Sequence, residues 1–169
     1  MGSAVERLVN YLNLEAQGDN VFVGQSPQTG RQRVFGGQVI GQAMVAAART
    51  IGAERHMHSL HCYFMRGGDP TVPIEYHVQR LRDGLSFSTR QVTAWQHGKA
   101  IYTLTGSFQR DEEGLTFETE MPPDVPLPES LLSETEFVEA YGEKLPASVR
   151  QYYRRERPIG LRPVAKAHF

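Results

Sequence analysis

The stretch from Gln38 to Ile51 limits the folds open to this chain more than any other part of the sequence. Beyond its first residue, only Gln42, Arg49 and Thr50 are polar. A helix that is apolar around most of its circumference is normally buried on most sides. We therefore expect one long central helix that the rest of the domain encloses.

Four runs typical of β-strands follow this helix, at residues 57–65, 73–81, 85–96 and 99–109. In the second run apolar and polar residues alternate, as they do in a strand with one buried face. The pairs Asp83-Gly84 and His97-Gly98 lie between later runs, where hairpin turns need residues that tolerate a positive φ. The sequence therefore predicts an antiparallel meander.

A flat sheet covers only one side of a helix, whereas a strongly curved sheet can surround it. The predicted fold class is therefore α+β, a hot-dog fold in which a curved antiparallel sheet wraps around one long central helix. We assign residues 1–118 to this domain. It begins with a short amphipathic helix at 3–13, where Ser3 and Glu6 have the spacing of a capping box, and a short strand follows at 21–23.

The last third of the chain differs in character from this domain. Four prolines in residues 122–128 predict an extended, semi-rigid linker. Ser133 and Glu136 have the spacing of a second capping box ahead of short helices. We assign residues 119–158 to this linker, and the alternation in 157–169 favours an edge strand.

The composition excludes several classes of protein. The net charge of -1 lacks the basic excess of nucleic-acid-binding proteins, so we expect no nucleic-acid partner. No stretch reaches the roughly 18 consecutive apolar residues of a membrane-spanning helix, so we expect no membrane association. Cys62 is the single cysteine, and the N-terminus lacks the pattern of a signal peptide. These features predict a cytoplasmic location.

Gly36, Gly37 and Gln38, at the start of the central helix, are the strongest local candidates for a binding site. A helix N-terminus offers unpaired N–H groups and partial positive charge, which can hold the oxyanion that develops when an acyl carbonyl is attacked. Glycines also allow a bulky ligand to approach the backbone. The alternative is that these glycines only permit a tight turn and close packing.

His56, His58 and His61 raise the question of a metal site. Side chains alternate between the two faces of a strand, so His61 should point away from the other two and three ligands should not converge. We therefore expect no metal. His58 is a candidate catalytic general base, and the alternative is a neutral histidine hydrogen-bonded inside the sheet. For Cys62 we expect a buried structural thiol.

Other polar residues have less specific patterns. Asp69 and Asp83 lie beside glycines, where short acidic side chains commonly stabilise turns. Four arginines are candidates to meet the phosphates of a nucleotide-bearing ligand, although scattered arginines are more often solvated surface groups. They are Arg31, Arg33, Arg49 and Arg66.

Three segments together resemble the type II acyl-CoA thioesterases, the TesB-like family. They are VFVGQSPQTGRQRVFGGQVIGQAMVAAART, HSLHCYFMRGGDPTVPIEYHVQRLRDGLSFSTRQVTAWQHGKAIY and RPIGLRPV, and they cover nearly the whole chain. The resemblance implies a hot-dog fold, acyl-CoA substrates, hydrolysis by water with no metal or organic cofactor, and association into oligomers. His58 also matches a family position that is considered functional.

The family normally carries two hot-dog repeats in one polypeptide, and this chain resembles the first repeat and the linker. Residues 159–169 resemble the start of the second repeat. The aspartate, threonine and glutamine with which the family activates water lie in that second repeat, and no residue here matches their motifs. The resemblance therefore implies that Gly36, Gly37 and Gln38 line a shared acyl channel while the sister helix supplies the acid.

Two functions stay open on this reasoning. The first is an acyl-CoA thioesterase, which hydrolyses fatty acyl-CoA to free fatty acid and CoA, represented here by its N-terminal half. The second is a noncatalytic acyl-CoA-binding or assembly module that pairs with another hot-dog domain. A hydratase would need a carboxylate and a histidine near the helix, and residues 33–50 contain neither. Unpaired sheet edges predict a homo-oligomer or pairing with a second hot-dog domain.

Overall fold

The computed structural model describes residues 2–154 and 156–164. The chain forms two compact units. One is Val9–Gly114, and the other combines Met1–Leu8 with Leu115–Phe169. The predicted domain boundaries at residues 118 and 158 stay predictions.

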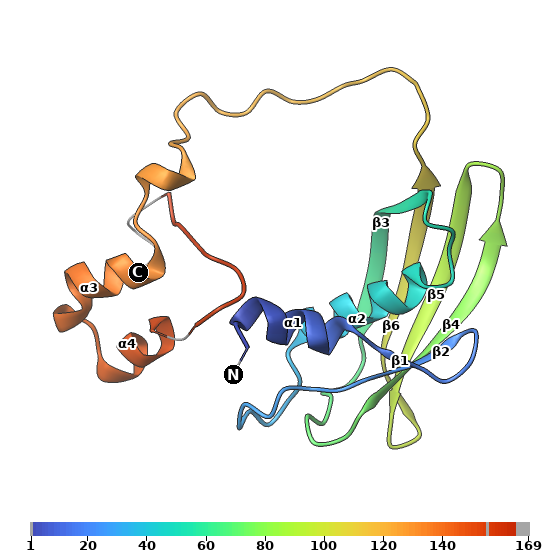
Figure 1. Cartoon of the computed structure of the whole chain (residues 1–169), viewed down its shortest axis with the longest axis horizontal. Coiled ribbons are helices and arrows are strands. Elements are labelled where there is room, and N and C mark those ends of the chain that lie inside the picture. The colour runs from blue at the N-terminus through green and yellow to red at the C-terminus, as the bar shows by residue number, and fades with distance from the viewer. Residues whose placement is uncertain (1, 155, 165–169) are drawn as a thin grey trace. The chain divides into compact units, whose positions relative to one another are not determined.

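Six strands of the larger unit form one antiparallel sheet (Figure 1). Their bounds are β1 Glu15–Ala16, β2 Val21–Gly24, β3 Arg55–Phe64, β4 Ile74–Asp83, β5 Phe87–Gln96 and β6 Lys99–Arg110. Their order across the sheet is β1-β2-β4-β5-β6-β3. Strands β4, β5 and β6 form the expected meander, and the four long strands lie where the sequence predicts strands.

The predicted meander is wrong for its first strand, because β3 pairs with β6 at the far edge and β2 takes the place beside β4. The connection from β3 to β4, residues 65–73, can span up to about 30 Å when extended. Crossing three strand spacings requires only about 15 Å. The connection is thus long enough for either topology, and strand periodicity alone does not distinguish them.

Helix α2, Gly36–Ala48, lies against one face of this sheet and contacts strands β2 to β6. The residues buried on its sheet-facing side are Val39, Gln42, Ala43, Ala46 and Ala47. Ile40, Met44 and Val45 are only half-buried and pack against the margin of the core. The expectation of burial on most sides is therefore only partly met, because the sheet covers one face of the helix.

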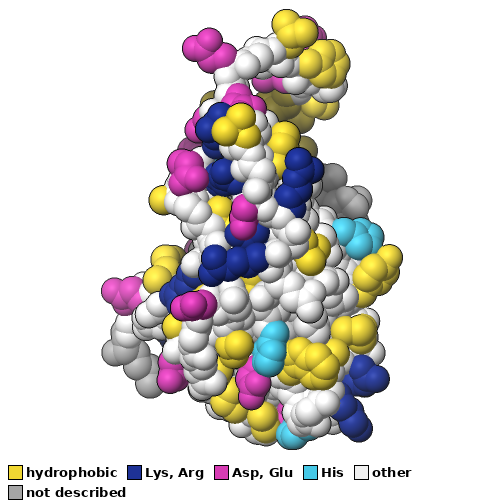
Figure 2. Space-filling model, turned by 90° about the vertical axis from the view of Figure 1, so that its right-hand side faces the viewer, with side chains coloured by type: hydrophobic (Ala, Val, Ile, Leu, Met, Phe, Trp, Pro, Cys, Tyr) yellow, Lys and Arg dark blue, Asp and Glu magenta, His cyan; other side chains and the backbone are white. Residues whose placement is uncertain are grey.

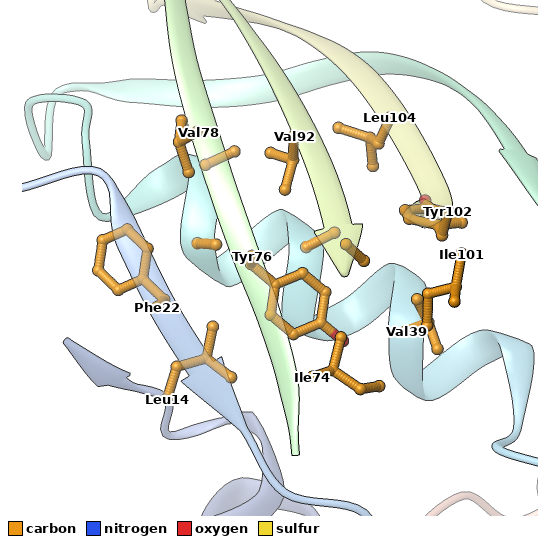
Figure 3. Close-up of a cluster of buried hydrophobic side chains, with 14 of the residues drawn as sticks. Leu14, Phe22, Val39, Ile74, Tyr76, Val78, Val92, Ile101, Tyr102 and Leu104 are labelled. Atoms are coloured by element: carbon orange, nitrogen blue, oxygen red, sulfur yellow. The ribbon is translucent and has the colours of Figure 1, made fainter. Parts of the chain in front are cut away.

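A continuous hydrophobic core fills the space between α2 and the sheet (Figure 3). Gln42 of α2 is also fully buried, and its Nε2 donates to the carbonyl oxygens of Tyr11 (2.7 Å) and Gln25 (3.0 Å). The Tyr76 hydroxyl donates to Oε1 of the same amide (2.7 Å). Both ends of the amide therefore have partners, which makes its burial tolerable.

The remaining helices are α1 Ala4–Leu12, α3 Glu134–Tyr141 and α4 Ala147–Tyr153, with short 3₁₀ turns η1 Pro128–Ser130 and η2 Gly142–Lys144. Both predicted capping boxes are present, since Ser3 and Ser133 each exchange hydrogen bonds with the glutamate three residues later. Residues 111–127 contain neither helix nor strand, so the Pro-rich stretch at 122–127 forms no sheet, as predicted. Residues 156–164 contain no strand, and the rest of the predicted edge strand lies outside the described residues. Within the described part, no helix has the length and apolar character needed to cross a membrane.

Candidate functional site

A cavity of about 390 Å³ opens at the N-terminal end of α2. The segment before α2 contributes Arg33 and Val34, and the helix itself contributes Gly36 and Val39. The end of β3 and the following connection contribute Phe64, Met65, Arg66, Gly67 and Gly68. Strand β6 contributes Ile101 and Tyr102. Figure 3 shows Val39, Ile101 and Tyr102 lying together at this end of the core. The walls are mainly apolar, and the polar groups are few.

Backbone hydrogen bonds bring these three parts of the chain together. The Val34 N–H donates to the carbonyl oxygen of Gly68 at 2.9 Å, which ties the segment before α2 to the β3–β4 connection. The N–H groups of Met65 and Arg66 both donate to the carbonyl oxygen of Ile101, at 2.9 and 3.1 Å. The connection that follows β3 thus forms one wall of the cavity.

The first turn of α2 has no side-chain cap. Its N-cap residue Phe35 has an extended backbone, and its side chain forms no capping hydrogen bond. The first N–H groups of the helix therefore lack a side-chain partner. Gly36 lines the cavity, and a Cβ there would lie 3.0 Å from Cζ of the Phe64 ring. Glycine at this position therefore allows the aromatic ring to approach the helix start.

The other two predicted residues of this turn lie beside the cavity rather than in its wall. Gly37 is exposed. The Gln38 Nε2 donates to the carbonyl oxygen of Gln25 (3.1 Å) and to Oγ of Ser26 (3.0 Å), so this side chain holds the preceding loop. Their predicted substrate contacts stay predictions.

Tyr102 introduces an unusual feature into the cavity wall. Its side chain is fully buried, yet its hydroxyl has no hydrogen-bond partner among the described residues. The Cys62 thiol lies beside this hydroxyl without the geometry of a hydrogen bond. Burial is the largest cause that raises the pKa of Tyr102, and the neighbouring thiol is the second. An unpaired buried hydroxyl costs on the order of 1–3 kcal/mol. The Tyr102 ring also packs on Phe64, with centroids 5.0 Å apart.

A β-bulge after Met57 changes which way the histidines of β3 point. His56 pairs with Gln109 and His61 with Thr105 on β6, and these partners lie four residues apart, on one face of the sheet. The expectation that His61 faces away from His56 is therefore wrong, because the extra residue of the bulge shifts the alternation by one.

His58, the predicted general base, lies on the outer face of the sheet and not in the cavity. Its Nε2 is 2.9 Å from Oγ of Ser107, and its ring contacts Phe87 edge-on at 5.8 Å. It is exposed, not buried in the sheet.

Figure 2, which views the strand side of the molecule, shows histidine, charged and hydrophobic side chains intermixed. The described residues include no cluster of histidine, cysteine or acidic side chains suited to a metal ion.

The two predicted turn aspartates both accept local hydrogen bonds. Asp69 Oδ1 accepts from the N–H (2.9 Å) and the hydroxyl (2.6 Å) of Thr71, and these bonds lower the pKa of Asp69. Asp83 accepts from Arg90 instead, and Gly84 has no positive φ. The positive φ expected at this turn is therefore absent, whereas His97 and Gly98 do adopt positive φ values of 50° and 67°.

The cavity brings together two of the four candidate arginines, Arg33 and Arg66. Arg49 does not line the cavity and instead donates to the Leu14 carbonyl oxygen and to Oδ1 of Asn13. Arg31 does not line the cavity. The sequence did not indicate a role for Tyr102. The alternation of polar and apolar residues around it is that of an ordinary strand with one face in the core.

Comparison with known proteins identifies the class to which this fold and cavity belong. A solved structure described as having a hot-dog fold, from Alicyclobacillus acidocaldarius, matches with a TM-score of 0.65 at 22% identity, over 75% of this chain and 48% of that one. The tesB protein of Mycobacterium avium subspecies paratuberculosis matches with a TM-score of 0.70 at 37% identity, over 76% of this chain and 50% of that one. The predicted hot-dog fold is confirmed.

The family model of the acyl-CoA thioesterase N-terminal domain matches residues 25–109, so the chain belongs to this family. Acyl-coenzyme A thioesterase 8 of Rattus norvegicus is 42% identical over 166 residues, which cover 93% of this chain and 51% of the relative. The chain thus spans about half the length of the curated relatives it matches. The predicted family resemblance is confirmed.

Proposed function

We propose that this chain acts as the N-terminal half of an acyl-CoA thioesterase, which hydrolyses fatty acyl-CoA to free fatty acid and CoA in cytoplasmic fatty acid metabolism. The observation that carries the proposal is the mainly apolar cavity at the uncapped start of α2, in a chain of the acyl-CoA thioesterase N-terminal domain family. Gly36, Gly37 and Gln38 border the substrate channel at this point. Their backbone N–H groups offer the positive end of the helix to the substrate.

The chemistry of the cavity implies that a second hot-dog domain contributes catalytic groups that this chain lacks. None of the described residues that line it is aspartate, glutamate or histidine, so this wall offers no general base to activate water. The base and its partners would come from the second domain. For His58 to take part, that domain would have to bring the thioester to the outer face of the sheet.

The edge of the sheet is suited to receive such a domain. Strand β3 pairs on one side only, with β6, so its other side presents unpaired backbone groups within the described sheet. Several large side chains on or next to this strand are exposed: Leu60, Tyr63, Phe64 and Met65. We propose that a second hot-dog domain, from another copy or from a longer polypeptide, pairs along this edge.

A thiol-release assay with acyl-CoA of short to long chain length, run on this chain together with a second hot-dog domain, tests the proposal. Gly37→Val is the test variant, because the atoms nearest to its Cβ belong to the exposed ring of Phe35, which can move aside. Gly114→Val is the matched control, because nothing lies within 4 Å of a Cβ there. Turnover that the first variant loses and the second keeps supports the thioesterase.

A second function, a noncatalytic acyl-CoA-binding or assembly module, is favoured by the lack of acidic and histidine side chains in the cavity wall. In that case the chain binds acyl-CoA, Gly37→Val weakens the binding, and no thiol is released. A chain that neither hydrolyses nor binds acyl-CoA contradicts both functions.

A further inference from the structure

Two arginines, Arg33 and Arg66, line the cavity. Neither Arg33 nor Arg66 forms an ion pair within the described residues, and none of the described residues that line the cavity is acidic. Both side chains are exposed on the cavity rim. An anion bound in this cavity would be attracted to both cations.

The local structure holds both cations at this position. Arg66 Nη1 donates to the carbonyl oxygen of Ala100 at 2.6 Å, which fixes one amino group and leaves the rest of the fork available to a ligand. The stem of Arg33 lies across Gly67, where a Cβ would come within 3.0 Å of its Cδ. Glycine at 67 therefore gives the Arg33 side chain its path along the rim.

The chemistry of the groups at this rim selects the charged end of an acyl-CoA. A thioester carbonyl is neutral before it reacts and needs only one or two N–H donors. Phosphate groups carry full negative charges, and the planar fork of arginine matches their oxygens. The start of α2 adds partial positive charge at the same cavity.

We propose that Arg33 and Arg66 bind the phosphate groups of acyl-CoA, so that this cavity anchors the nucleotide end of the substrate. The proposal rests on the proposed function, from which it takes acyl-CoA as the ligand. It narrows the role of Gly36, whose N–H then faces phosphate oxygen rather than the acyl group. Arg33 and Arg66 are binding residues in this scheme and take no part in bond cleavage.

The proposal also locates the thioester. The pantetheine arm separates the diphosphate from the thioester by a length on the order of 15 Å, if it extends like a backbone of four or five residues. A cavity of about 390 Å³ does not hold both ends. The thioester therefore lies beyond this cavity, which agrees with a wall that contains no general base.

Calorimetric titration of the chain with CoA, dephospho-CoA and pantetheine tests the proposal without relying on turnover. We expect Arg33→Gln and Arg66→Gln each to raise the Kd for CoA roughly tenfold, and the double variant to raise it about a hundredfold if the two effects add. Binding of pantetheine, which lacks the phosphates, should not change. Arg31→Gln removes the same charge from a residue outside the cavity wall and serves as the matched control.

Lysine variants separate charge from geometry. Arg33→Lys and Arg66→Lys keep the positive charge but lose the fork, so their Kd values for CoA should lie between those of the wild type and the glutamine variants. Comparison of CoA with dephospho-CoA shows whether the 3′-phosphate or the diphosphate is held. Retained thermal unfolding of each variant shows that the fold is intact.

Three outcomes would overturn the proposal. If the glutamine variants bind CoA as tightly as the wild type while acyl-CoA is still bound or hydrolysed, the phosphates lie elsewhere and the proposed function survives. If the variants lose affinity for a fatty acid carboxylate but not for CoA, the arginines hold the product instead. If the wild-type chain binds no acyl-CoA, the proposed function fails together with this inference.

Discussion

Arg90→Met should destabilise the larger unit strongly, because this buried side chain uses its whole guanidinium group. Arg90 is 2% exposed. Its Nε donates to Oγ1 of Thr50 (2.8 Å), and its Nη2 donates to the Thr50 carbonyl oxygen (3.1 Å) and to Oδ1 of Asp83 (2.7 Å). Its Nη1 donates to the carbonyl oxygens of Arg82 (3.1 Å) and Thr89 (3.0 Å). The residue thus ties the chain just after α2 to the end of β4.

The expected loss of unfolding free energy is about 2–3 kcal/mol. Methionine keeps much of the apolar stem, so the cost arises mainly from the lost hydrogen bonds. The two bonds to Thr50 are buried, and each is worth on the order of 1 kcal/mol. Water can replace the guanidinium at Asp83, whose side chain is 53% exposed, so the ion pair itself adds less than about 1 kcal/mol.

Urea unfolding monitored by the fluorescence of Trp95 measures this loss. Trp95 is the single tryptophan and lies on β5, the strand that carries Arg90. Asp83→Asn is the matched variant, because it removes the ion pair and leaves the bonds to Thr50. We expect a small change for Asp83→Asn and a large one for Arg90→Met, both with an unchanged m-value. Equal losses would refute the reasoning and assign the stability to the ion pair.

The pH dependence of these two proteins gives an independent check. Hydrogen bonds from Arg90 first, and then from Ser88, lower the pKa of Asp83 in the folded state. A carboxyl whose folded pKa lies below its unfolded value contributes stability above the unfolded pKa and loses it as the pH falls through the folded pKa. The difference between wild type and Asp83→Asn should therefore be constant near neutral pH and shrink below about pH 4.

Two further predictions concern the amide of Gln42 and the tyrosines of the core. Gly24→Ala should cost about 2 kcal/mol, because its Cβ would lie 2.7 Å from the fixed Gln42 amide, whereas Gly114→Ala should be neutral in the same urea titration. Tyr76→Phe should cost about 1 kcal/mol through the lost bond to Gln42, whereas Tyr102→Phe should leave stability unchanged or raise it, because its hydroxyl has no partner. A Tyr102→Phe variant as unstable as Tyr76→Phe would contradict the account of the unpaired hydroxyl.

Periodicity and turn chemistry are sufficient to predict most of the elements. The apolar run after Gln38 predicts α2, and the alternation in residues 73–81 predicts β4, because each pattern reflects which side chains meet the core. The burial of Gln42 and Arg90 has no comparable signal. Each is tolerated only because partners distant in sequence satisfy its polar atoms, and a local pattern contains no information about such partners.

The bulge in β3 shows a similar limit. Strict alternation assigns His56 and His61 to opposite faces, and one extra residue places them on the same face. The residues around the bulge do not differ from those of a regular strand. The positions of histidine side chains along this edge therefore depend on the pairing with β6, which only the structure provides.

The wrong prediction for the position of β3 in the sheet and the unpredicted arrangement of Arg33 and Arg66 have one cause. If β3 paired with β4, the connection at residues 65–73 would close a hairpin at the sheet, and its residues would not reach the start of α2. Because β3 pairs with β6 instead, the connection crosses the end of the sheet and hydrogen-bonds to Val34 through Gly68. This crossing brings Arg66 to the cavity that Arg33 also lines, so a site for an anion arises from a choice of strand order that local sequence patterns do not determine.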